Sequence, residues 1–221
     1  MHIQKNIGDH FSSESWTTQY IVDQFTAFTT TKEIHLAEQS TLHYLAILDG
    51  SADITLSFLS TGEQATVYVY ALLLGNIWTT IKAHIHTHLA HNHTTAHMHL
   101  ISFLPTQATI ILDGWVDIHP DVSKVSWHLL EENIILGAWI QIKTLPMLDV
   151  QSNDVSASHG ARIEKLDPKK LFYAQSRGLH EAEAKWLLVH GYIQQCFWSF
   201  ITQNPELENL QQTIFTDLMN R

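Results

Sequence analysis

Apolar and polar positions alternate along most of the chain between about residue 34 and residue 155. The alternation is clear in the run Thr66-Val67-Tyr68-Val69-Tyr70, and β-branched and aromatic residues are abundant in the neighbouring segments. This pattern is typical of short strands that bury one face. Small polar clusters separate the segments, often about fifteen residues apart, although the spacing is not strict. The pattern therefore predicts a body built from many short strands.

Two architectures are compatible with such strands: an antiparallel barrel or sandwich, and a parallel β-helix in which successive coils stack. Tight antiparallel hairpins favour Asn-Gly and Asp-Gly turns. Asn-Gly is absent, Asp113-Gly114 lies inside a strand-like run, and the chain holds 9 glycines, which is few for many hairpins. These observations favour the β-helix and leave the antiparallel alternative open.

The pattern changes to helical spacing at Asp167-Pro168. Asp is a good N-cap and Pro is favoured at the first helical position, while Gly178 is suited to end the helix. A second helix is expected from about His180 and a third from Asn204-Pro205. We therefore expect three parts. Residues 1–33 form a segment that caps the β body, by strands or otherwise, residues 34–166 form the β body, and residues 167–221 form a helical domain.

Composition limits the partners and the compartment. Acidic residues outnumber basic ones 22 to 12, and Lys and Arg do not cluster as a nucleic-acid surface requires. Cys196 is the single cysteine, so no internal disulfide can form and a reducing compartment fits. The start of the chain lacks the layout of a signal peptide, and no apolar run approaches the ~18 residues of a membrane span. We expect a cytoplasmic protein that binds neither nucleic acid nor membrane.

The stretch from His84 to His99 holds seven of the 16 histidines. On a strand, His84, His86 and His88 project from one face, a geometry that zinc, iron and copper sites use. One hypothesis is therefore a cupin-like metal enzyme, although a cupin places a Glu a few residues later and the next Glu here is Glu131. The competing interpretation, a solvated strand face rich in imidazole, is favoured.

His159-Gly160 lies where the extended pattern gives way to the helical one. Because glycine permits unusual backbone dihedrals, spacing alone favours a structural corner over a ligand. Cys196 lies in an apolar helical stretch and is expected to be packed rather than reactive. The chain contains no nucleophile elbow, phosphate-binding glycine loop or dinucleotide fingerprint, and we expect no enzymatic activity.

Several motifs in order resemble one family. They are "NDVSASHGARIEKLDPKKLFYAQSRGLHEAEAKWLLVHGY" at 153–192, "ILDGWVDIHPDVSKVSWHLLEENIILG" at 111–137 and "KTLPMLDV" at 143–150. In these motifs the sequence resembles the SufB/SufD scaffold proteins of the SUF iron–sulfur cluster assembly system, on the SufD side. The resemblance implies a right-handed parallel β-helix followed by a small helical domain. It also implies edge-to-edge pairing of that β-helix with a SufB-like protomer or a second copy.

The resemblance further implies that the helices beyond about Asp167 dock a SufC-like ATPase. The residues expected to take part in that docking are Phe172, Tyr173, Ser176, Arg177 and Gly178. By the same resemblance, His159 corresponds to a histidine at the protomer interface and is expected to be a transient ligand of iron or of an iron–sulfur cluster. No tightly bound cofactor is expected.

The sequence departs from the family pattern in several places. Ala157 stands where SufD members often have a cysteine, and Gly160 stands where SufB has an acidic residue. The β pattern begins within some thirty residues of Met1, so the family's large N-terminal helical region is expected to be missing. The lack of cysteines along the body argues against a principal scaffold of the SufB type. We expect a non-catalytic assembly component.

Overall fold

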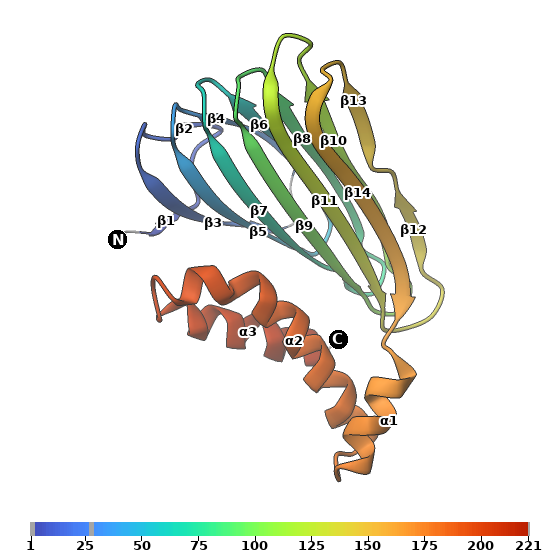
Figure 1. Cartoon of the computed structure of the whole chain (residues 1–221). Coiled ribbons are helices and arrows are strands. Elements are labelled where there is room, and N and C mark those ends of the chain that lie inside the picture. Colours follow the sequence, from blue (N-terminus) through green and yellow to red (C-terminus); the bar gives the residue numbers. More distant parts are fainter. Residues whose placement is uncertain (1–2, 27–28, 221) are drawn as a thin grey trace.

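The computed structural model describes residues 3–26 and 29–220, and two parallel sheets dominate it (Figure 1). The first sheet contains, in spatial order, β1 (Ile3–Lys5), β3 (Thr18–Thr26), β5 (Thr41–Asp49), β7 (Thr66–Leu74), β9 (Thr95–Leu104), β11 (Ser123–Ile135) and β14 (Asp154–Lys165). The second contains β2 (His10–Ser12), β4 (Thr29–Leu36), β6 (Ala52–Ser60), β8 (Thr80–Leu89), β10 (Thr109–Ile118) and β12 (Gln141–Thr144), with β13 (Met147–Val150) also paired to β10.

The chain passes alternately through the two sheets, and the described strand pairings are parallel. This arrangement is a parallel β-helix, so the predicted fold is confirmed and the antiparallel alternative is wrong. The alternation in the sequence has a direct cause, because successive side chains of a strand point to opposite faces. In β6 every second residue is buried. Inward side chains of this and the other strands fill the space between the sheets, among them Ile54, Val69, Leu112 and Trp127.

A column of left-handed residues forms one corner of the coils. Trp16, Gln39, Gln64 and His93 have positive φ angles, and the amide of each donates to a carbonyl of the next coil over 2.9 to 3.2 Å. Non-glycine residues adopt this conformation at some cost, which these stacked hydrogen bonds offset. The corners therefore do not depend on glycine, which explains why a chain with so many turns contains so few glycines.

Three helices follow the strands: α1 (Pro168–Ser176), α2 (Glu181–Ile201) and α3 (Leu207–Met219). The side chain of Asp167 accepts a hydrogen bond from the amide of Lys169, and Gly178 has a φ of 97°, so the predicted start and end of α1 are confirmed. The third helix begins at Leu207, slightly later than predicted. The side chain of Asn204 caps the preceding turn instead, by accepting from the amide of Glu206 at 3.0 Å.

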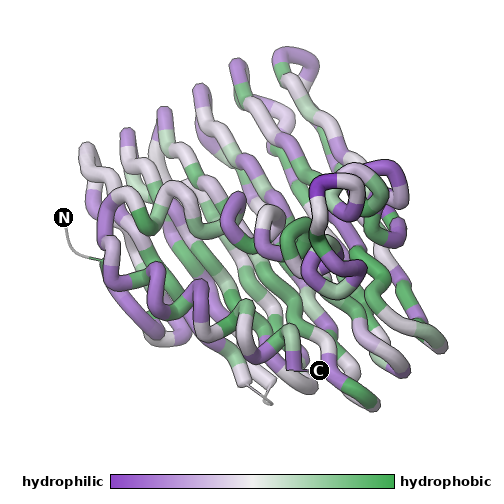
Figure 2. Tube along the Cα trace, turned by 90° about the horizontal axis from the view of Figure 1, so that it is seen from below, coloured by the Kyte–Doolittle hydropathy of each residue, from purple (hydrophilic) through white to green (hydrophobic). Residues whose placement is uncertain are grey.

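Helices α2 and α3 cover the outer face of the first sheet (Figures 1 and 2). A second hydrophobic cluster lies there, where Leu72 and Phe103 of the sheet meet Ile193, Phe197 and Phe200 of α2. Figure 2 shows hydrophobic stretches of the strands behind the helices. Cys196 is fully buried in this cluster and burial raises the pKa of its thiol, which confirms the prediction of a packed cysteine.

Strands β1 to β3, which belong to residues 1–33, pair in the same two sheets as the later strands. Strand pairing thus continues across residue 34 without a break, while the proposed division at residues 33 and 166 stays a prediction. None of the described helices combines the length and apolar character needed to cross a membrane.

Candidate functional site

The last coil, made by β12, β13 and β14, ends the β-helix with an open edge. Strand β14 terminates the first sheet and, among the described strands, pairs with β11 alone. Leu148 and Val150 of β13 lie in register with the core residues Val116 and Ile118 of β10, yet both are more than a third exposed. Ile163 of β14 is 52% exposed. The hydrophobic core therefore reaches the end of the coil stack without a cover.

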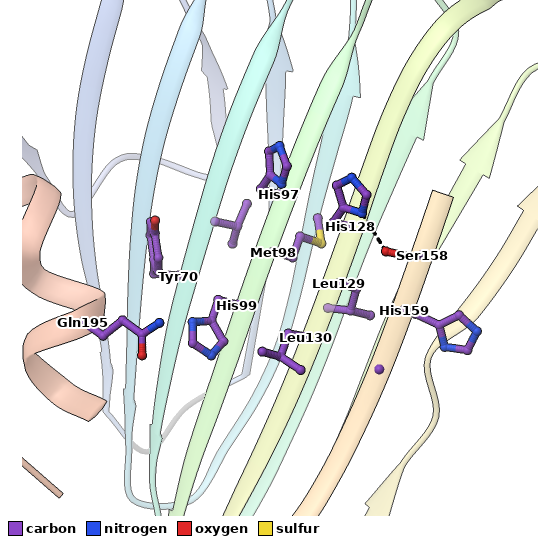
Figure 3. A pocket seen from close by; sticks show the side chains of 12 residues that line it. Tyr70, His97, Met98, His99, His128, Leu129, Leu130, Ser158, His159 and Gln195 are labelled. Carbon is purple, nitrogen blue, oxygen red and sulfur yellow. Dashed lines mark hydrogen bonds between the residues drawn. The ribbon is translucent and has the colours of Figure 1, made fainter. Parts of the chain in front are cut away.

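His159 lies in the middle of β14, in register with the core residue Leu129. Its side chain consequently points to the face of β14 that looks toward the second sheet, and it is exposed. Figure 3 shows its imidazole on the far side of β14 from His97, His99 and His128. Gly160 has no positive φ, and an added Cβ there would meet the Leu130 side chain at an ordinary 3.7 Å. The interpretation of His159 as a corner is therefore wrong.

The opposite face of β14 borders a groove of about 470 Å³ between the first sheet and α2 (Figure 3). A column of stacked rings runs along the sheet to this groove. Ring centroids lie 4.5 to 5.4 Å apart along the series Tyr20, His43, Tyr68, His97 and His128. Burial, and then the neighbouring His128, lowers the pKa of His97. The column links the strands from β3 to β11 through aromatic contacts.

Two sets of polar contacts fasten the outward face of β14 to the neighbouring strands. The Nδ1 atom of His128 lies 2.6 Å from the hydroxyl oxygen of Ser158. The buried carboxylate of Glu132 contacts the Nε2 atom of His99 at 2.6 Å and Arg162 at 3.2 Å. The outward side chains of β14 thus hold the strand in place, while its inward face presents His159.

The neighbouring Glu131 points inward and is fully buried. Its carboxyl group accepts hydrogen bonds from the backbone amide of Gly114 at 3.1 Å and from the hydroxyl of Thr144. Burial raises its pKa to about 7, although the hydrogen bonds from Thr144 and Gly114 favour the ionised form, and the negative charge of Asp113 adds to the increase. Sequence reasoning considered Glu131 only as a distant cupin ligand. The signal was available, because Glu131 occupies an inward position that continues Val125, Trp127 and Leu129.

The histidine-rich stretch does not form one cluster. His84, His86 and His88 lie on the outer face of the second sheet, whereas His97 and His99 lie on the outer face of the first. On β8, His84 pairs with Asp113, and His88 contacts Asp117 at 2.7 Å. Across residues 3–26 and 29–220, no group of three or more His, Cys, Asp and Glu side chains is arranged to hold a metal ion. The structure therefore gives the cupin-like hypothesis no support.

The residues expected to dock a partner lie on α1 and just after it. Phe172 and Tyr173 are 73% and 61% exposed. The guanidinium of Arg177 lies 5.3 Å from the centroid of the Tyr173 ring, and the hydroxyl of Ser176 donates to the carbonyl of Tyr173. Figure 1 shows α1 standing away from the sheets. An aromatic pair with ordered polar neighbours is thus presented to solvent.

Known proteins share these sequence features. Residues 13–192 match the family model described as SUF system FeS cluster assembly, SufBD core domain. The iron–sulfur cluster assembly protein SufD of Escherichia coli is 21% identical over 196 residues, which cover 86% of this chain and 44% of that protein. A SufBD family protein of Synechocystis is 31% identical over 85 residues, covering 38% of this chain and 19% of that protein.

SufD of Bacillus subtilis is 29% identical over 86 residues, covering 39% of this chain and 20% of that protein. The chain therefore spans less than half the length of these curated relatives. The family match extends from the early coils through β14 and α1 into α2, and so it includes the open end of the β-helix. The chain belongs to the SufB/SufD family of iron–sulfur cluster assembly proteins.

Proposed function

We propose that this chain is a non-catalytic, SufD-like subunit of an iron–sulfur cluster assembly complex in the cytoplasm. It pairs through its last coil with a SufB-like protomer or a second copy, and it docks a SufC-like ATPase through its C-terminal helices. The observation that carries the proposal is His159 on an exposed terminal strand, at an uncovered end of the core, in a chain that matches the SufBD core domain.

The open edge of β14 supports the pairing. A terminal strand presents backbone N–H and C=O groups that another strand can bind, and proteins usually shorten or cover such edges. Here β14 has 12 residues, and exposed apolar side chains of β13 and β14 lie beside it. A second β-helix added to this edge would cover those side chains together with the inward face of His159.

His159 is proposed as a transient ligand for iron or a nascent cluster, which the complex carries as its product. Imidazole is an established ligand of iron–sulfur centres. Ala157 lies on the same face of β14, two residues away, so this chain supplies no thiolate beside His159. The remaining ligands would then come from the paired protomer, which agrees with a cluster that is assembled at an interface and handed on.

The aromatic pair on α1 supports ATPase docking. Exposed aromatic residues are enriched among the residues that contribute most to binding at protein interfaces. The first test is co-purification of the full chain with a SufC-like ATPase from the same genome. The double variant Phe172→Ala/Tyr173→Ala is expected to lose the ATPase, whereas Trp78→Ala, at an equally exposed corner of the β-helix, is expected to retain it. Retention by the α1 double variant would refute the docking proposal.

The second test separates pairing from cluster binding. Ile163→Lys places a charge on the open edge and is expected to abolish pairing, measured by light scattering, while Ile77→Lys at a distant exposed position leaves it intact. His159→Ala is expected to preserve pairing and to lower the iron content and visible absorbance of complexes reconstituted anaerobically. His84→Ala serves as its control. Equal cluster content in the His159→Ala and control complexes would exclude His159 as a ligand.

A further inference from the structure

The carboxyl group of Glu131 connects three strands at the last coil. Glu131 belongs to β11 in the first sheet, and its hydrogen bonds reach Gly114 on β10 and Thr144 on β12, both in the second sheet. The side chain thus spans the core between the sheets. Strand β14 is the next strand of the first sheet, and its residue Ala161 is in register with Glu131.

The fold makes room for this carboxyl group. A Cβ atom at position 114 would lie 2.3 Å from a methyl carbon of Leu129 and 3.1 Å from the Oε1 atom of Glu131, so a larger residue would displace the Leu129 side chain. On the other side, β14 places the small side chains of Ala157 and Ala161 opposite Trp127 and Glu131. Gly114 and Ala161, two residues with minimal side chains, thus lie beside Glu131 on the neighbouring strands.

Glu131 has no cationic partner among the ion pairs of residues 3–26 and 29–220. The negative charge of Asp113 on β10 opposes its ionisation, and His159 on β14 comes two residues before Ala161, which is in register with Glu131. Lys143 precedes Thr144 on β12 but points to the outer face, because it is in register with Ile111. A buried carboxylate without a cation is unfavourable unless it can be rehydrated.

The strand that carries Thr144 is short and lies at the edge of the second sheet. Strands β12 and β13 have four residues each, and Leu145 and Pro146 interrupt the edge between them. Pro146 has no amide hydrogen to donate. A short edge strand of this kind opens more easily than the inner strands. Opening of β12 would release Thr144 and admit water to the carboxyl group.

We propose that Glu131 is a positioning residue of the His159 site. Its hydrogen bonds from Gly114 and Thr144 join the two sheets at the last coil, and because the carboxyl group is buried without a cation, its ionisation favours the opening of β12 and the entry of water. When β12 is closed, it holds the inward face of the second sheet in place across from His159. When β12 opens, the surface that we propose a partner to cover becomes looser. The effect on a partner rests on the proposed pairing through the last coil. The opening of β12 is a property of this chain alone.

Thermodynamic linkage gives the size of the effect. The carboxyl group has a pKa of about 7 in the closed coil. If it regains its ordinary pKa when β12 opens, the opening equilibrium rises about tenfold between pH 6 and pH 8. The direction follows because opening favours the ionised form, whose population increases with pH.

The test is amide hydrogen exchange of the full chain, without iron or partner, expressed as protection factors so that the intrinsic pH dependence is removed. Protection of residues 141–150 is expected to fall about tenfold from pH 6 to pH 8 in the wild type. In Glu131→Gln it is expected to stay constant, because the amide keeps the shape without titrating. Glu208→Gln, an exposed substitution in α3, is the matched control and should behave like the wild type.

A pH-independent protection of residues 141–150 in the wild type would overturn the inference, as would an identical pH profile in Glu131→Gln. His159→Ala is expected to keep the wild-type profile, so a failure of the proposed cluster role leaves this result unaffected. Conversely, if the Ile163→Lys variant still pairs, the proposed pairing is refuted. The hydrogen-exchange profile would still test the role of Glu131.

Discussion

The two ends of the β-helix each bury a carboxyl group between the sheets, and they satisfy it in different ways. At the first end, Asp23 contacts the ammonium of Lys32 at 2.8 Å and accepts hydrogen bonds from the Tyr44 hydroxyl at 2.6 Å and the Ile7 amide at 2.8 Å. At the last end, Glu131 has two neutral donors and, within the part of the chain that the structure describes, no cationic partner. The first carboxyl group therefore has a countercharge, whereas the second depends on neutral donors alone.

The presence or absence of a cationic partner decides how a buried carboxyl group responds to pH. A carboxylate with a cation and further donors is compensated at every physiological pH, but it depends strongly on each partner. A carboxyl group without a cation favours its protonated form and can be switched by ionisation. Glutamine or an apolar residue at position 131 would avoid that sensitivity. The chain nevertheless has glutamate at the end that we propose to pair with a partner.

The largest expected effect comes from breaking the network at the first end. Asp23→Asn leaves the ammonium of Lys32 buried without a countercharge, and the free energy of unfolding is expected to fall by about 3–5 kcal/mol. Urea unfolding at pH 7 measures the change. Lys32→Met should cost a similar amount, and the double variant much less than the sum, because each single change leaves a lone buried charge. Additive losses would show that the two groups do not act as a pair.

The next effect is the pH dependence at the last end. Because the folded state holds the Glu131 proton more tightly than the unfolded chain, the contribution of this group is greatest below about pH 4.5 and is lost as the pH rises toward about 7. Between pH 5 and pH 8 the loss should amount to about 2–3 kcal/mol. The measurement is the difference in unfolding free energy between wild type and Glu131→Gln at each pH. A difference that does not change with pH would contradict a raised pKa.

The same comparison shows how far the sequence could predict this structure. Alternation from Thr66 to Tyr70 and the Asp167-Pro168 cap are local signals, and both predicted the correct elements. A local pattern cannot show that His84 and His97 lie on opposite sides of the molecule. Alternation shows which residues share a face of one strand, but not which of the two sheets contains that strand. Gly160 suggested a corner, yet the backbone continues as a strand because β11 pairs with it on both sides of that residue.

Glu131 could have been found by counting inward positions from Val125, although its partners could not. Gly114 is 17 residues earlier, and Thr144 lies on a strand of the other sheet. Such contacts depend on the register of the coils, which the sequence specifies only through the packing of the whole core. The function of Gly114 illustrates the point, because it looked like a misplaced hairpin turn and instead makes room for Leu129 and Glu131.

The smallest expected effect concerns Glu132, the neighbour of Glu131 on the opposite face of β11. Its carboxylate is 6% exposed, but its cationic partner Arg162 is 60% exposed, so solvent screens much of that ion pair. Arg162→Met should lower the free energy of unfolding by less than about 1 kcal/mol, because His99 still contacts Glu132 at 2.6 Å. Urea unfolding at low and high salt measures the change, which should shrink as salt increases. A loss comparable to that of Asp23→Asn would mean that the last coil is held by this ion pair rather than by Glu131.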